Sequence, residues 1–154
     1  MKCNMLIIKE INPSQTHEIR LEVLRKNIAL PVIFTGDDDP STIHLGVFLN
    51  DKLVAISSFM QSQNTLFEGK QYQLRGMATL PEHRGLGAGS KMMLKAFELL
   101  KQRNTDVLWC NARIVAVDFY KKLGLKTIGD KFEIKPIGDH YVMAIAIKKI
   151  DENI

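Results

Sequence analysis

The segment Leu80-Pro81-Glu82-His83-Arg84-Gly85-Leu86-Gly87-Ala88-Gly89-Ser90 joins a β-prone run, Gln71–Thr79, to a run with helical spacing that begins near Leu86. Glycines let backbone N–H groups approach a ligand with no Cβ in the way. A helix start adds unpaired N–H groups and the positive end of the helix dipole. The segment therefore predicts an anion-binding turn, and a phosphate-bearing partner is the natural expectation.

Two common phosphate-binding motifs do not match this turn. A dinucleotide fingerprint counted from Gly85 requires glycine at position 90, where the chain has Ser90. A nucleoside-triphosphate loop requires Gly-Lys-Ser/Thr, but Lys91 is followed by Met92. The spacing that remains is Arg-x-x-Gly-x-Gly. A glycine-rich helix start without any ligand stays the alternative.

The residues after the turn predict a helix and then a strand. Apolar residues with helical spacing, which we interpret as core, are Met92, Met93, Ala96, Phe97 and Leu100. The apolar run Asp106–Asn111 then indicates a strand. A helix between two strands is typical of a βαβ unit, so Gln71–Thr79 and Asp106–Asn111 are expected to be parallel.

The C-terminal part continues with one helix and further strands. Ile114–Leu123 has helical spacing, and Gly124 is a helix-ending residue. The β-prone segments that follow are 126–128, 131–135 and 141–147, interrupted at 129–130 and 136–139.

In the N-terminal part, Met5–Lys9 predicts a first strand, and the runs 43–49 and 53–59 predict a hairpin with a turn at 50–52. Between them, Ser14 to about Lys26 predicts a helix on which Arg20 points mostly outward. The acidic, breaker-rich segment Pro31–Ser41 is interpreted as an exposed loop.

Composition limits the class of protein. With 154 residues and 45% hydrophobic content, a single domain spanning residues 1–154 is expected. No run of about 18 apolar residues or signal-peptide pattern is present, which favours a cytoplasmic protein without a membrane partner. Cys3 and Cys110 lie far apart and form no metal-ligand spacing, so both are expected to be reduced thiols and no metal is expected.

The charge is modest. The net charge is +4 and the sequence pI is about 9.1, with lysines scattered along the chain. Such a pattern is typical of a solvated surface and does not demand a nucleic-acid partner.

Two motifs resemble the GNAT superfamily of acetyl-CoA-dependent N-acetyltransferases. Leu80–Ser90 with the following amphipathic helix is similar to its acetyl-CoA motif. Asn111-Ala112 followed by Ala116–Leu125 resembles its second motif, which ends in Phe-Tyr-x-x-x-Gly-Phe, with Leu125 in place of the last phenylalanine. The order of elements over residues 4–148 is similar too. The resemblance implies an α/β (α+β) fold with a mixed, mostly antiparallel sheet of about six or seven strands. It also implies a parallel pair that splays at the coenzyme site, and about four helices.

The resemblance implies transfer of the acetyl group of acetyl-CoA to a primary amine of a small molecule or a protein, by direct attack in a ternary complex. A monomer or a homodimer is expected. A non-catalytic module that binds coenzyme A or acyl-CoA is one alternative. An unrelated protein that binds other phosphate ligands is another.

The implied coenzyme-binding residues fall into three groups. The pyrophosphate would be bound by the turn, which consists of Arg84, Gly85, Leu86, Gly87, Ala88, Gly89 and Ser90. Main-chain groups of Met77, Ala78 and Thr79 would bind the pantetheine arm as an added strand. The side-chain amide of Asn111 would bind near this arm.

The implied catalytic residue is Tyr120, whose phenol would protonate or stabilise the departing thiolate. The base is not evident, because the strand before the turn offers Gln71, Gln73 and Arg75 where the family often has a glutamate. His140, His44, Glu82 and ordered water stay open as candidates. A covalent acyl-enzyme on Cys110 is a minor alternative.

Overall fold

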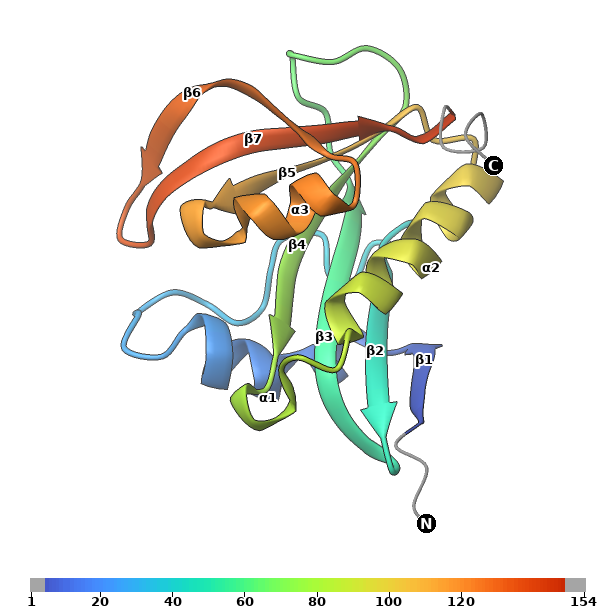
Figure 1. Ribbon diagram of the computed structural model, residues 1–154, viewed down its shortest axis with the longest axis vertical. Coiled ribbons are helices and arrows are strands. Elements are labelled where there is room, and N and C mark those ends of the chain that lie inside the picture. The colour runs from blue at the N-terminus through green and yellow to red at the C-terminus, as the bar shows by residue number, and fades with distance from the viewer. Residues whose placement is uncertain (1–4, 149–154) are drawn as a thin grey trace. The chain divides into compact units, whose positions relative to one another are not determined.

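The computed structural model describes residues 5–148, and these form one seven-stranded sheet with the order β1-β2-β3-β4-β5-β7-β6 (Figure 1). The pairs β1/β2, β2/β3, β5/β7 and β6/β7 are antiparallel, and β4/β5 is parallel. The strands are β1 (Leu6–Glu10), β2 (Ile43–Leu49), β3 (Lys52–Gln61), β4 (Gln71–Thr79), β5 (Val107–Arg113), β6 (Lys126–Ile134) and β7 (Gly138–Ala146). The predicted mixed, mostly antiparallel sheet is confirmed.

Three α-helices are described: α1 (His17–Ile19), α2 (Ala88–Gln102) and α3 (Val117–Lys122). Single 3₁₀ turns cover Pro13–Thr16, Pro81–His83 and Ile114–Ala116, and a π-helical turn covers Arg20–Leu24. The expected helix from Ser14 is therefore one helical segment of mixed type that ends at Leu24. The helix after the glycine turn begins at Ala88, two residues later than expected.

The chain divides into two compact units. One comprises the described residues up to Met60 together with Gly76–Ala96, and the other comprises Gln61–Arg75 together with the described residues from Phe97 onward. Both β4 and α2 contribute to each unit. The single domain expected from the sequence stays a prediction.

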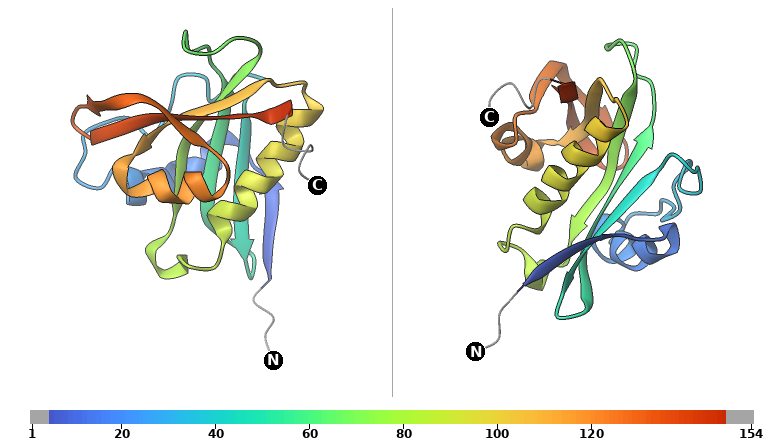
Figure 2. Two further views of the ribbon diagram at one scale, coloured as in Figure 1. Left: turned by 45° about the horizontal axis from the view of Figure 1, so that its top comes forward. Right: turned by 90° about the vertical axis from the view of Figure 1, so that its right-hand side faces the viewer.

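In the first unit, β3 has a helical layer on each of its faces, as the right-hand view of Figure 2 shows for α1 and α2. Ile56 packs with Ile19, Ala78 and Leu80 in one buried cluster. Its neighbour Ser57 points to the opposite face and donates a hydrogen bond to the Met92 sulfur in α2 (3.2 Å). This alternation is the two-residue period of a strand buried on both faces.

The hairpin between β2 and β3 is tighter than expected. Lys52 pairs with Leu49, so the connection consists of Asn50 and Asp51 alone. Both have positive φ, 50° and 67°. Asn and Asp tolerate this conformation best among residues other than glycine, and it suits a two-residue hairpin turn.

The expectation that Arg20 points outward is wrong, because its side chain is fully buried. The guanidinium donates two hydrogen bonds to the Asp37 carboxylate (2.7 and 2.9 Å), one to the Val32 carbonyl (2.8 Å) and one to Ser58 Oγ (3.0 Å). The Phe34 ring lies 3.8 Å from the guanidinium carbon. These partners satisfy most of the polar groups of the cation, which makes its burial possible.

The exposed-loop interpretation of Pro31–Ser41 is also wrong in part, because Phe34 and Asp37 are buried. The Asp37 carboxylate accepts the Phe34 N–H (2.9 Å) as well as the Arg20 bonds. This loop is therefore fixed to the helical segment by the ion pair with Arg20, and Arg20 in turn bonds to Ser58 of β3.

In the second unit, the parallel β4/β5 ladder is short. It pairs Gln71 to Gln73 with Val107 to Trp109, and no further pair joins these two strands among the described residues. The predicted splaying of the parallel pair is in line with this limited pairing.

The end of α3 agrees with the prediction, whereas β6 is one strand in place of two expected segments and β7 begins at Gly138, within the expected interruption 136–139. Gly124 ends α3 with φ 99°, and the Leu125 N–H bonds back to the Tyr120 carbonyl (3.1 Å). The expected interruption at Gly129 (φ 78°) is absent. This residue lies in an irregular stretch within β6, between Ile128 and Phe132. A bulge of this kind interrupts the pairing without ending the strand.

Candidate functional site

The turn predicted to bind an anion has an open main chain at the start of α2. Gly85 and Gly87 have φ of 81° and 83°, and a Cβ at either position would meet nothing within 4 Å. The first helical hydrogen bond runs from Lys91 N–H to the Gly87 carbonyl (3.0 Å). Among the described residues, no acceptor pairs with the N–H groups of residues 85–90. Arg84 is exposed beside them, so the turn fits a phosphate group.

The strand before this turn places Met77, Ala78 and Thr79 at its end. Ala78 is buried in the cluster around Ile56, whereas Met77 and Thr79 are half-buried. Gly76 precedes them with φ 64° inside β4, and this conformation strongly favours glycine. The parallel pairing with β5 has ended by this point, so these main-chain groups are outside that ladder.

Tyr120 and Cys110 are both buried in the second unit. Burial raises the pKa of Tyr120 well above its usual value, and the nearby Cys110 raises it further. The Phe119 ring packs edge-on against the Tyr120 ring, with centroids 5.1 Å apart. The phenol therefore keeps its proton and can serve as a donor but not as a base.

Cys110 is a free thiol, and burial raises its pKa to about 12. Nucleophilic attack by cysteine requires the thiolate, so this residue is poorly suited to form an acyl-enzyme. The neighbouring Asn111 is half-buried on β5. Cys3, the other predicted reduced thiol, lies outside the described residues.

The three candidate bases differ in what their side chains contact. Both ring nitrogens of His44 are engaged, Nδ1 with Ser58 Oγ (2.7 Å) and Nε2 with the Asp37 carbonyl (2.9 Å). Glu82 is exposed and lies 3.8 Å from Lys52 Nζ. The ring of His140 is buried and uses Nδ1 alone, 2.7 Å from the Gly138 carbonyl oxygen.

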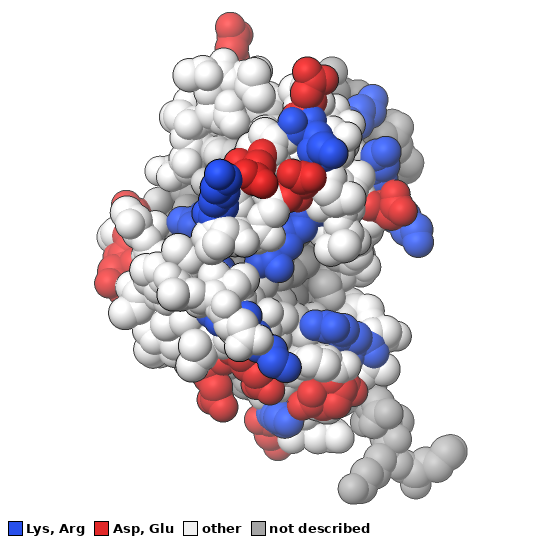
Figure 3. Space-filling model, turned by 90° about the vertical axis from the view of Figure 1, so that its left-hand side faces the viewer, with Lys and Arg blue, Asp and Glu red and all other residues white. Residues whose placement is uncertain are grey.

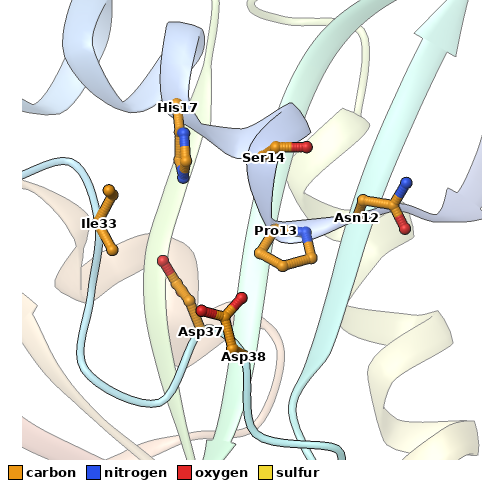
Figure 4. A pocket seen from close by; sticks show the side chains of 7 residues that line it. All are labelled: Asn12, Pro13, Ser14, His17, Ile33, Asp37 and Asp38. Atoms are coloured by element: carbon orange, nitrogen blue, oxygen red, sulfur yellow. The ribbon is translucent and has the colours of Figure 1, made fainter.

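A pocket of about 350 Å³ in the first unit contains none of the predicted site residues. Figure 4 shows the His17 ring pointing from the helical segment toward the loop that carries Asp37 and Asp38. The lining residues are Asn12, Pro13, Ser14, His17, Ile33, Asp37 and Asp38. Because Arg20 neutralises Asp37, the pocket offers only one further carboxylate and is not a cluster of ligating groups.

Sequence reasoning missed Arg20 and Asp37, although one signal was present. Arg20 lies four residues after Thr16 and four before Leu24, and therefore at a position of the inward-facing stripe. A charged residue at such a position indicates a buried partner.

Within residues 5–148, no group of three or more His, Cys, Asp or Glu side chains is arranged to hold a metal ion. Over the same range, no helix has the length and apolar character needed to span a membrane.

Comparison with known proteins agrees with this geometry. The model of the acetyltransferase (GNAT) family matches residues 8–125. A Bacillus subtilis (strain 168) protein named "Uncharacterized N-acetyltransferase YitI" is 40% identical over 141 residues, covering 90% of this chain and 95% of that protein. The chain therefore belongs to the GNAT acetyltransferase family and is an acyltransferase enzyme.

Solved structures show the same fold at low identity. FeeM, an N-acyl amino acid synthase from uncultured soil microbes, has a TM-score of 0.80 at 13% identity, covering 96% of this chain and 93% of FeeM. An aminoglycoside 6'-N-acetyltransferase solved with coenzyme A has a TM-score of 0.73 at 14% identity, covering 92% and 97% of the two chains.

Proposed function

We propose that this enzyme transfers the acetyl group of acetyl-CoA to a primary amine by direct attack in a ternary complex. The observation that carries the proposal is the row of unpaired N–H groups from Gly85 to Ser90 at the start of α2. A pyrophosphate supplies the multiple anionic oxygens that such a row can bind. Membership of the acetyltransferase family makes acetyl-CoA the donor that fits this turn.

The remaining coenzyme contacts are assigned by the chemistry of each part of the ligand. Arg84 adds positive charge beside the pyrophosphate, within the turn Arg84–Ser90. The main chain of Met77, Ala78 and Thr79 hydrogen-bonds the amides of the pantetheine arm. The Asn111 amide, half-buried on β5, binds near the same arm.

Tyr120 acts as the acid in this proposal. The neutral amine nitrogen forms a bond to the thioester carbon, the C–S bond breaks, and the phenol proton passes to the departing sulfur. The nitrogen loses a proton to solvent as the amide forms, and the phenol is reprotonated from solvent. The raised pKa of Tyr120 supports this role, because it keeps the phenol protonated until the thiolate forms.

The acceptor is a small-molecule or peptide amine in this proposal. Lysines, arginines and acidic residues are interspersed on the face shown in Figure 3, without the single-sign surface that nucleic acid requires. The reduced, buried Cys110 suits the cytoplasm, the compartment that we propose. We propose one domain, as a monomer or a homodimer.

The decisive experiment measures release of the coenzyme A thiol from acetyl-CoA across amines, amino acids, polyamines and peptides. At least one acceptor should give saturable turnover. Tyr120→Phe should lower turnover about 10²-fold or more while calorimetric affinity for coenzyme A stays nearly unchanged. Unchanged turnover would remove the role of Tyr120. Tight coenzyme binding without any transfer would favour the non-catalytic module instead, and binding of other phosphates but not coenzyme A would favour an unrelated binder.

A further inference from the structure

The β6–β7 hairpin holds the His140 imidazole in one defined state. Its Nδ1 lies 2.7 Å from the Gly138 carbonyl oxygen, in the same strand. A carbonyl oxygen can only accept a hydrogen bond, so Nδ1 donates. In the neutral ring the lone pair then resides on Nε2. The hairpin therefore selects the form of histidine whose Nε2 is ready to take a proton.

The surroundings of the ring leave Nε2 available. The residue is only 4% exposed, with the Phe132 ring of β6 tilted beside the imidazole at a centroid distance of 6.0 Å. Within the described chain, Nε2 has no hydrogen-bond partner. It is nevertheless not completely buried, because part of its surface stays accessible. Nε2 is thus without a protein partner among the described residues and is not completely enclosed.

Strand alternation places His140 and Tyr120 on opposite faces of the sheet in the second unit. His140 pairs with Arg113 of β5, and Asn111 lies two residues before Arg113, so these three side chains share a face. Cys110 points to the other face, and the phenol of Tyr120 is close enough to Cys110 for that thiol to affect its ionisation. The proposed acid Tyr120 therefore lies on one face of β5, and His140 and Asn111 lie on the other.

The charges that face His140 are few. On β5 the facing charged residue is Arg113, and on β6 the facing residue is Phe132. Two acidic side chains of the hairpin alternate to the other face and have lysine partners, Asp139 with Lys131 at 3.6 Å and Glu133 with Lys135 at 3.8 Å. Neither of these two carboxylates therefore faces Nε2, and the third acidic residue of the hairpin, Asp130, is exposed in the irregular stretch of β6.

We propose that His140 is the general base of the transfer, an inference that rests on the proposed function. Nε2 takes one proton from the ammonium form of the acceptor, which frees the nitrogen lone pair to attack the thioester carbon. The C–N bond forms, the C–S bond breaks, and the sulfur receives its proton from Tyr120 on the opposite face. The nitrogen loses its second proton to solvent as the amide forms, and the Tyr120 phenolate is reprotonated from solvent. His140 then releases its proton to solvent through the accessible Nε2. Of the other two candidate side chains, His44 has both ring nitrogens hydrogen-bonded, and Glu82 is an exposed carboxylate 3.8 Å from Lys52 Nζ.

The test uses His140→Asn, because the asparagine N–H can keep the bond to the Gly138 carbonyl while Nε2 is lost. In the full-length enzyme, kcat/KM for the amine should fall about 10²-fold or more, and the acidic limb of its pH profile should disappear. Affinity for coenzyme A and the unfolding midpoint should stay close to those of the unchanged protein. His17→Asn, at a half-buried histidine outside the proposed site, is the matched control and should leave rate and pH profile unchanged.

A second measurement does not depend on turnover. Nitrogen NMR of histidine-labelled protein should show His140 as the Nδ1–H form, which is the minority form of free histidine. An Nε2–H form would overturn the proposal, and so would a His140→Asn variant that retains the original rate and pH profile. If no amine is acetylated at all, both the proposed function and the base fail. If transfer occurs but is insensitive to His140, the base alone fails.

Discussion

Asp37→Asn should be among the most destabilising single substitutions in this chain, because it leaves a buried cation without its counter-charge. The variant keeps the size of the side chain but cannot pair with both Arg20 nitrogens, which the Asp37 carboxylate now accepts at 2.7 and 2.9 Å. The Arg20 and Asp37 side chains are 0% and 2% exposed. Breaking a buried pair by removing one partner costs about 3–5 kcal/mol. For a chain of this length, that loss corresponds to a fall in Tm of roughly 6–20 °C.

The assay is urea unfolding followed by circular dichroism, with the slope m compared between variants. Asp39→Asn is the control, because Asp39 is exposed and bonds only locally to Ser41. It should change the free energy of unfolding by no more than about 0.5 kcal/mol. A loss below about 1 kcal/mol for Asp37→Asn would refute the reasoning, since the ion pair would then not hold the loop.

The same ion pair predicts how stability changes with pH. Burial acts to raise the pKa of Asp37, but hydrogen bonds from Arg20 and Phe34 N–H outweigh it, and the net pKa lies below the ordinary 3.8. A carboxyl whose pKa is lowered in the folded state stabilises the protein fully above the unfolded pKa and loses that contribution as pH falls toward the folded pKa. The stability difference between the unchanged protein and Asp37→Asn should therefore be constant above about pH 5 and shrink below about pH 4.

Three further predictions concern other residues. Gly87→Ala should weaken coenzyme A binding roughly tenfold or more in calorimetry by placing a Cβ at the open turn; Gly129→Ala, with a similar positive φ and equally open space, should be strained alike yet bind normally. Gly76→Ala should lower the free energy of unfolding by about 2–5 kcal/mol, because φ is 64° and the new Cβ would lie 2.8 Å from Phe34; a loss below about 1 kcal/mol would contradict this. Cys110→Ala should keep turnover within about twofold, since a protonated thiol takes no part, and an inactive but folded variant would reverse that conclusion.

Local patterns predicted the regular elements well. The strand Gln71–Thr79 has the bounds expected from its β-prone run, and Gly124 ends α3 as a helix-ending glycine should. In both places the signal is contained within a few neighbouring residues. The glycine turn was also predictable, because open main chain at a helix start is encoded by the spacing of the glycines themselves.

The environment of Arg20 could not be predicted in the same way. Its partners Asp37 and Ser58 lie 17 and 38 residues away in sequence, so burial depends on contacts that no local period contains. The acidic, breaker-rich composition of Pro31–Ser41 predicts an exposed loop, because the residue that neutralises Asp37 lies outside this segment, in the preceding helical one. For the site, the sequence leaves three side chains and ordered water as possible bases, because local patterns contain no information on the hydrogen bonds that these side chains make.

The buried ion pair also limits which substitutions at positions 20 and 37 can be tolerated during evolution. Losing either Arg20 or Asp37 alone is costly, whereas replacing both with apolar side chains of similar volume is often neutral or even stabilising. Single-step intermediates should therefore be rare among relatives, and the two positions should covary. A relative that keeps arginine at position 20 should keep an acidic residue at position 37. The pair should therefore distinguish the relatives of this chain from other proteins that share the fold at low sequence identity.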